Sequence, residues 1–124
     1  MKKLSDFNRA ILEGNFNRNS MQGLDLRGFQ LADVNFAHCN LSGCIFNGCD
    51  LTCADFTGAT LNGASFIAAI APGATFRDAS LRGTDFYGAA LACAEFQGAD
   101  LRGATLYGVV RDAIKNLNLH GAIY

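Results

Sequence analysis

A large apolar residue returns at every fifth position along most of this chain. Counting in fives from Phe36 to Leu106, each position is Phe or Leu, with Ala71 as the single exception. The residue two positions before each of these is small, mostly Cys or Ala, with Thr84 as the one polar member. Each stretch of five residues therefore carries one small and one large apolar side chain.

Glycine and polar residues fill the remaining positions. A glycine stands two residues after the large apolar position in most units, where a turn with positive φ is least costly. The residue between the small and large apolar positions is often polar, which places both apolar side chains on one face of a strand. A period of five matches neither an amphipathic helix nor a heptad, and one unit is too short to hold a core. We therefore expect the units to stack.

The units ADFTG, ATLNG, ASLRG, TDFYG and ADLRG resemble the repeats of the pentapeptide-repeat family, and the resemblance covers residues 16–110. It implies an all-β fold, a right-handed quadrilateral β-helix with four pentapeptides in each of about five coils. On this architecture Phe falls on two opposite walls and Leu on the other two. The aromatic rings should then stack in columns, one of them made of Phe16, Phe36, Phe56, Phe76 and Phe96.

The N-terminal segment departs from the period, although we expect residues 1–124 to form a single domain. Residues 1–15 are predicted to be an N-terminal cap over the repeats of residues 16–110. Ser5 can N-cap a short helix that runs through Glu13 and ends before a glycine. Such a helix would cover the open end of the solenoid, where apolar side chains and backbone groups lack partners.

The C-terminal segment, residues 111–124, also departs from the period. Arg111 would fall on an inward position, so the repeat is predicted to stop at Val110 and to be followed by a short helical interruption. The pattern then resumes in a shifted frame. Leu119 takes the central apolar position, Gly121 takes the turn position, and Tyr124 is the next central residue. No cap follows, which predicts either an end-to-end contact between two copies or a longer protein. The residues expected at that end-to-end contact are Leu119, Ile123 and Tyr124.

Charge and composition narrow the range of partners. Lys and Arg total 10 against 11 Asp and Glu, so the chain lacks the excess of charge that attracts nucleic acid or anionic membranes. No stretch approaches a membrane span or a secretory signal. We therefore expect neither nucleic acid nor membrane as a partner. The odd number of cysteines, 5, spaced by the repeat, favours the reducing cytoplasm.

The residues that most often carry chemistry form no catalytic or metal-binding pattern. Cys39, Cys44 and Cys49 follow the repeat and should point inward as substitutes for Ala. Cys53 and Cys93 replace turn glycines two coils apart and are predicted to be exposed thiols beyond disulfide reach. The two histidines, at positions 38 and 120, are too far apart in the coil register to act together. We predict a protein that is not an enzyme and that needs no cofactor or metal.

Two sets of outward positions stand out when residues are stacked at intervals of twenty. The first is an apolar stripe in which Ile67, Tyr87 and Tyr107 form one column and Ile70, Ala90 and Val110 form the next. Contiguous exposed apolar side chains that include Tyr are typical of interfaces. The second set stacks Arg82 with Arg102, near Asp100, where a carboxylate or phosphate of a partner could bind.

Two functions follow from this pattern. The first is a non-catalytic structural or protein-protein interaction module with an unknown protein partner, which includes a homodimer through the C-terminal end. The alternative is implied by the resemblance alone, because some pentapeptide-repeat proteins mimic duplex DNA and bind type II topoisomerase, protecting it from quinolones. That mimicry needs stacked carboxylates, whereas the outward acidic residues here are scattered among arginines. We therefore favour the first function.

Overall fold

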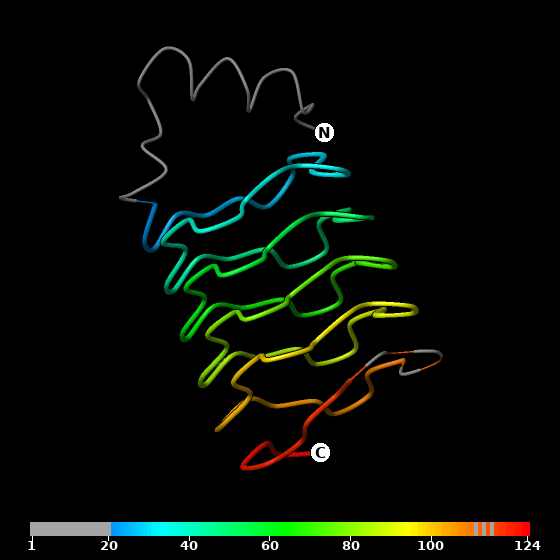
Figure 1. Ribbon diagram of the computed structural model, residues 1–124. Helices are drawn as coiled ribbons and strands as arrows, with labels where there is room; N and C mark the ends of the chain where they lie inside the picture. The colour runs from blue at the N-terminus through cyan, green and yellow to red at the C-terminus, as the bar shows by residue number, and fades with distance from the viewer. Residues whose placement is uncertain (1–20, 111, 113, 115) are drawn as a thin grey trace.

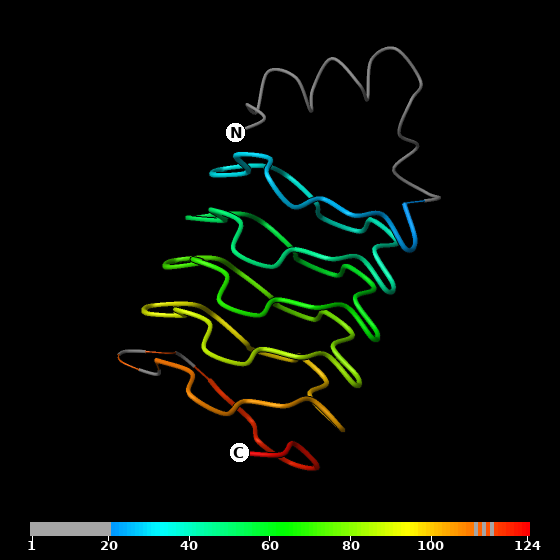
Figure 2. The same cartoon turned by 180° about the vertical axis from the view of Figure 1, so that it is seen from behind.

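The computed structural model describes residues 21–110, 112, 114 and 116–124. The backbone winds into coils that are stacked along one axis, as Figure 1 shows from one side and Figure 2 from behind. None of the described residues lies in a helix, and the strands are reduced to single bridge residues spaced five apart. The prediction of an all-β solenoid is confirmed. The predicted capping helix in residues 1–15 lies outside the described residues.

Parallel bridges between residues twenty positions apart set the register of the coils. Asp55, for example, bridges Asn35 in the coil before it and Thr75 in the coil after it. With one bridge residue in every five, a step of twenty gives each coil four walls. The walls are named by their bridge residues: wall A contains Asp25, Ile45, Ser65, Asp85 and Thr105; wall B contains Gln30, Asp50, Ile70, Ala90 and Val110; wall C contains Asn35, Asp55, Thr75 and Glu95; and wall D contains Asn40, Thr60, Ser80 and Asp100.

Each five-residue unit consists of a bridge residue and a tight turn. In one central unit, the Ala59 amide donates a hydrogen bond to the Phe56 carbonyl at 3.0 Å, and Gly58 between them has a φ of 66°. Positive φ at the third residue is typical of a type II turn and explains the glycine. The Phe56 amide donates to the Thr75 carbonyl of the next coil at 2.8 Å. Backbone hydrogen bonds therefore link each coil to its neighbours as well as closing its own turns.

Phenylalanine rings fill the interior from two opposite walls, as the sequence predicts. The rings of one wall stack on each other, as between Phe56 and Phe76, whose centroids lie 5.0 Å apart with planes 3° apart. Rings of facing walls meet edge to face, as between Phe46 and Phe56 at 5.6 Å and 83°. Both geometries are favourable for aromatic pairs. Walls B and D carry leucine at the matching positions, except at Ala71, and these side chains are buried. The first residue of the predicted Phe column, Phe16, lies outside the described residues.

The regular register extends slightly beyond the predicted stop at Val110. The Cys93 amide donates to the Asp112 carbonyl at 3.1 Å, the same step of nineteen residues by which Gly73 donates to Ala92 in the preceding coil. Regular pairing between coils therefore reaches Asp112, two residues beyond Val110.

The final rung is a repeat in a shifted frame, as the sequence predicts. Ile123 bridges Thr105, a step of eighteen residues in place of twenty. The Ala122 amide donates to Leu119 at 2.9 Å around a turn in which Gly121 has a φ of 74°. The predicted helical interruption finds no support in the described residues of that segment, because 112, 114 and 116 are not helical. The residues between them, 111, 113 and 115, lie outside the described part of the chain.

Candidate interaction surface

The first column of the apolar stripe lies at the corner between walls A and B. The Gly48 amide donates to the Ile67 carbonyl, and the Gly88 amide donates to the Tyr107 carbonyl at 2.9 Å, so that corner residues of successive coils lie in line. Ile67 is half-buried, whereas the side chains of Tyr87 and Tyr107 are 58% and 52% exposed. The structure therefore brings the two tyrosines together on the surface, one coil apart.

The second column of the stripe is formed by the bridge residues of wall B. Ile70 pairs with Ala90, which pairs with Val110. Ile70 and Val110 are 50% and 47% exposed. The two columns are joined through the corner, because only two residues separate each tyrosine from the wall B bridge residue that follows it. The predicted apolar stripe is thus a continuous surface in the C-terminal coils. Its role as an interface stays a prediction.

The residues expected at an end-to-end contact do not share one environment. Leu119 is half-buried and packs against the core, whereas Ile123 and Tyr124 are 48% and 64% exposed. Tyr124 follows the residue that bridges Thr105 and therefore lies at the rung above Leu106. Ile123 pairs with Thr105 and so continues the outer face of wall A.

The two arginines of the second set differ in their access to a carboxylate. Arg102 donates two hydrogen bonds to Asp100, from Nε at 2.9 Å and from Nη2 at 2.7 Å. Arg82 reaches the same carboxylate only at 3.9 Å. The hydrogen bonds from the Arg102 side chain and backbone lower the pKa of Asp100 to about 2. One carboxylate therefore faces two guanidinium groups, and Arg82 keeps most of its donors for another ligand.

A short sequence spacing explains this difference and was not used in the sequence analysis. Arg102 and Arg27 each have an aspartate two residues earlier, at Asp100 and Asp25, and both pairs form the same two-pronged contact. Arg82 has a serine at that place. The side chains of residues two positions apart, at the bridge and in the following turn, lie next to each other. In an Asp-x-Arg sequence the aspartate therefore neutralises the charge of the arginine. The spacing could have been found in the sequence.

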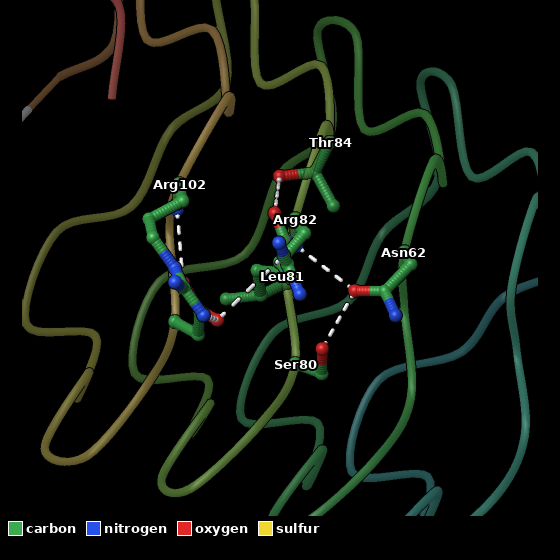
Figure 3. Close-up of polar contacts among 7 residues, drawn as sticks. Asn62, Ser80, Leu81, Arg82, Thr84 and Arg102 are labelled. Carbon is green, nitrogen blue, oxygen red and sulfur yellow. Dashed lines mark hydrogen bonds and ion pairs between the residues drawn. The ribbon is translucent and has the colours of Figure 1, made fainter. Parts of the chain in front are cut away.

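The turn that carries Arg82 is held by a residue of the coil before it. Figure 3 shows the side chain of Asn62 between Ser80 and Arg82. Its Oδ1 accepts hydrogen bonds from the Ser80 hydroxyl at 2.6 Å and from the Arg82 amide at 3.0 Å. At several other turns an Asp or Asn at the bridge position caps its own turn, as Asp85 does for the amide of Tyr87 at 3.0 Å. The side chain of Ser80 is too short to cap this turn, and Asn62 accepts the hydrogen bond from the Arg82 amide instead.

The cysteines lie where the sequence predicts. Cys39, Cys44 and Cys49 are buried in the core, and burial raises the pKa of the Cys49 thiol to about 11. Cys53 and Cys93 are exposed, at turn positions with φ of 56° and 60°. The inward cysteines therefore pack like small apolar side chains.

The two histidines lie in different surroundings. The His38 ring lies against the turn of the next coil, so close to Gly58 that a Cβ added there would meet its Nδ1 at 2.5 Å. His120 borders an open depression of about 250 Å³ together with Asn118 and Arg102. Among the described residues no group of three His, Cys, Asp or Glu side chains could hold a metal ion. The same residues include no helix that is long and apolar enough to cross a membrane.

Four-walled coils of five-residue units define this chain as a repeat solenoid. The family model described as a pentapeptide repeat region matches residues 29–106, more than half of the chain. The chain therefore belongs to the pentapeptide-repeat family, as the resemblance of its repeats indicated.

Several solved structures are similar to this chain. A pentapeptide repeat protein from the thylakoid lumen of Arabidopsis thaliana is 32% identical, over 89% of this chain and 68% of its own, with a TM-score of 0.53. Rfr23 from the cyanobacterium Cyanothece 51142 is 21% identical, over 94% of each chain, with a TM-score of 0.47. The plasmid-mediated fluoroquinolone resistance protein QnrB1 is 17% identical, over 88% of this chain and 74% of its own, with a TM-score of 0.41. A comparison with curated proteins finds no matching sequence.

Proposed function

We propose that this protein is a non-catalytic interaction module that binds another protein through the apolar stripe. The observation that carries this proposal is the continuous row of exposed apolar residues at the corner of walls A and B and on wall B itself. Ile70, Tyr87, Tyr107 and Val110 are each about half exposed, and all lie in the C-terminal coils. Contiguous apolar surface of this kind is typical of protein interfaces.

The rigidity of the surface supports the same function. Tyr87 and Tyr107 project from tight turns that are tied by backbone hydrogen bonds to the coils on either side. A side chain on such a support loses little backbone entropy when a partner binds. Tyrosine is also enriched among residues that dominate binding energies, because it combines a large apolar ring with a hydroxyl. The solenoid thus offers a preformed binding surface.

The proposal is tested by replacing both tyrosines with serine. We expect the Tyr87→Ser, Tyr107→Ser variant to lose partners that affinity capture and quantitative crosslinking recover with the unchanged chain. A matched control is Arg77→Ser with Gln97→Ser, which alters the diagonally opposite corner of neighbouring coils. Thermal melts would show that both variants keep the fold. If every interaction survives the tyrosine changes, the stripe is not the binding surface.

A second contact is proposed at the C-terminal end. Ile123 and Tyr124 present apolar side chains there, 48% and 64% exposed, on the last described rung. An end-to-end homodimer would cover both of them. Light scattering should then give a dimer that becomes a monomer in the Ile123→Ser, Tyr124→Ser variant. An unchanged molar mass in that variant would contradict an end-to-end contact.

The placement of the carboxylates argues against the alternative of DNA mimicry. In wall A two coils separate Asp25 from Asp85, and in wall C Thr75 lies between Asp55 and Glu95. Within the described residues no wall or corner column has acidic residues in successive coils, so no charged row resembles a phosphate backbone. The likeness to QnrB1, at 17% identity, lends no support to that function.

We propose that the protein resides in the reducing cytoplasm. Its support is the chemistry of the thiols, because three buried cysteines replace alanine in the core and two exposed ones lie on separate coils. Imaging of the tagged chain in its native cells would test this. Accumulation in an oxidising compartment would contradict it.

A further inference from the structure

A row of basic side chains follows the corner between walls D and A through the last coils. The Gly83 amide donates to the Arg102 carbonyl at 3.0 Å, which sets Arg82 and Arg102 one coil apart (Figure 3). The step of eighteen residues at the last described rung makes His120 the counterpart of Arg102. Arg82, Arg102 and His120 therefore lie on three successive rungs, with about 4.8 Å between neighbouring rungs. We call these three residues the basic row.

An open depression of about 250 Å³ lies beside the basic row. Its lining includes Asp100, Arg102, Asn118 and His120, so it is formed where wall D of one coil meets the rung that follows. Asn118 and His120 are exposed, and the Arg102 side chain is 54% exposed. At about 30 Å³ for each molecule of liquid water, the depression can hold a small oxyanion together with several waters.

The positive charge of the basic row is only partly neutralised. The Asp100 carboxylate lies 2.7 Å from the Arg102 guanidinium and 3.9 Å from that of Arg82. Among the described residues, neither arginine has a second carboxylate at ion-pair distance. Asp85, on the adjacent wall A, accepts the amide hydrogen bond of its own turn instead. Two guanidinium groups thus share one carboxylate, which leaves one positive charge uncompensated, and protonation of His120 would add a second.

Several hydrogen-bond donors of this corner remain available to a ligand. Asp100 occupies Nε and Nη2 of Arg102 and leaves its Nη1 group. At 3.9 Å from Asp100, the Arg82 guanidinium is beyond hydrogen-bonding distance. Asn118 uses Oδ1 to accept a hydrogen bond from the His120 amide at 3.0 Å, so its Nδ2 group can donate to a ligand. Donors from three rungs can therefore converge on one acceptor group.

We propose that the basic row binds a phosphate group, either free or carried by a phosphorylated side chain of another protein. A phosphate monoester offers three oxygen acceptors and about 1.5 to 2 negative charges at pH 7, and the planar guanidinium of arginine pairs well with its oxygens. A carboxylate offers one charge, which Asp100 already supplies at this corner. The inference goes beyond the proposed function and does not depend on it, because the basic row and the apolar stripe lie along opposite edges of wall A.

The basic row is too short for a long polyanion. Asn62, which precedes Arg82 in the same column, carries no charge, and the net formal charge of the chain is -1. A nucleic acid would extend past the row onto a surface without the excess of positive charge that holds it. A single phosphate group fits the length of the row.

The turns that carry the basic row are already fixed. The backbone amides of Arg82, Arg102 and His120 each donate to the side-chain oxygen of an Asn or Asp, at 3.0, 3.1 and 3.0 Å. Binding therefore has to order only the ends of the side chains, which limits its entropic cost. A glycine with positive φ follows each of the three, so the next residue of each turn has no side chain that could cover the row.

The experiment is a titration with inorganic phosphate at pH 7 and low salt, followed by nuclear magnetic resonance of the backbone amides at this corner. We expect a dissociation constant on the order of 1 mM, because the site is open and the ion is small. Arg82→Gln should weaken binding about fivefold, as expected for the loss of one exposed ion pair. The matched control Arg77→Gln removes the same charge from an exposed arginine at another corner and should leave binding unchanged.

A second pair of variants adds charge in place of removing it. His120→Lys should tighten phosphate binding about threefold, because a fixed positive charge replaces the imidazole. Its matched control, Gln97→Lys, adds the same charge next to Arg77 and should have no such effect. Thermal melts would show that all four variants keep the fold.

Parallel titrations identify the source of the phosphate group. The probes are inorganic phosphate, a short phosphoserine peptide and the same peptide without the phosphate. Tighter binding of the phosphopeptide than of inorganic phosphate would indicate a phosphorylated protein partner. Tighter binding of the inorganic ion would indicate a free anion.

Two results would overturn the inference. In the first, the amide signals around the basic row stay unchanged at tens of millimolar phosphate. In the second, Arg77→Gln weakens binding as much as Arg82→Gln does, which would show attraction to the whole surface and no site. Neither result affects capture of a protein through Tyr87 and Tyr107, which tests the proposed function.

Discussion

The central coils and the last C-terminal rung are built from the same repeat but differ in what covers them. Phe56 and Phe76 each have stacked rings on both sides and are fully buried. In the last rung Leu119 is only half-buried and Tyr124 is 64% exposed. In a solenoid, burial depends on having neighbours above and below, and the inward positions of the last described rung are less buried than those of the central coils.

The largest expected difference concerns the core side chains. Phe56→Ala removes a fully buried ring between two others and should lower the free energy of unfolding by about 3–5 kcal/mol. Leu119→Ala removes a half-buried side chain in contact with the core on one side and should cost about 1 kcal/mol. Urea unfolding followed by circular dichroism would measure both. Equal losses would mean that the last rung is covered in solution.

A second difference concerns the turn glycines. Gly58→Ala should cost roughly 2–3 kcal/mol, because a Cβ at φ 66° is strained and meets the His38 ring at 2.5 Å. Gly63→Ala, at φ 69° with nothing within 4 Å, should cost about 1 kcal/mol. In the last described rung, Gly121→Ala meets Cγ of Arg102 at 2.9 Å and its backbone Cα at 3.4 Å, so it should cost more than Gly63→Ala. Thermal melts would rank the three.

A double variant separates the two causes at Gly58. If the collision with the ring is real, His38→Ala should recover about half of the stability that Gly58→Ala loses, whereas it should not improve Gly63→Ala. The same loss with and without the histidine ring would attribute the whole effect to backbone strain.

A third difference concerns the asparagines that cap turns. Asn62 joins two coils through Ser80 and the Arg82 amide, and Asn62→Ala should destabilise the protein by about 1–2 kcal/mol. Asn118 caps only the exposed turn of its own rung, where its Oδ1 accepts a hydrogen bond from the His120 amide at 3.0 Å. Asn118→Ala should therefore lower the free energy of unfolding by less than about 0.5 kcal/mol. Denaturant unfolding would measure both. A larger cost for Asn118 would contradict this ranking.

The smallest expected effect is on the pH dependence of stability, through Asp100, which lies between the central coils and the last described rung. Asp100 has its pKa lowered from 3.8 to about 2, first of all by its hydrogen bonds to Arg102. A carboxylate with a lowered pKa stabilises the fold above pH 3.8, and this contribution disappears as the pH falls to about 2. The difference in melting temperature between the unchanged chain and Asp100→Asn should therefore shrink from pH 5 to pH 2. Because the pair is exposed, 1 M salt should also reduce that difference.

Much of the candidate site could be predicted because it depends only on the register. Once the step of twenty is assumed, Tyr87 must lie beside Tyr107, and Arg82 beside Arg102. The neutralisation of one arginine and not the other could not be predicted from stacking alone, because it depends on which side chain reaches Asp100. The bond from Asn62 to Ser80 was missed for a similar reason, since it joins residues eighteen positions apart across two coils.

The sequence by itself determined that the units stack and that the cysteines point inward, because a strict period of five buries two apolar residues per unit. The four walls and the surface columns followed from the resemblance of the units to pentapeptide repeats. The tertiary structure decided what the period does not contain: the extension of the register to Asp112, the step of eighteen residues at the last rung, and the partners of each arginine. These depend on contacts between coils, where the length and direction of individual side chains determine which donors and acceptors meet.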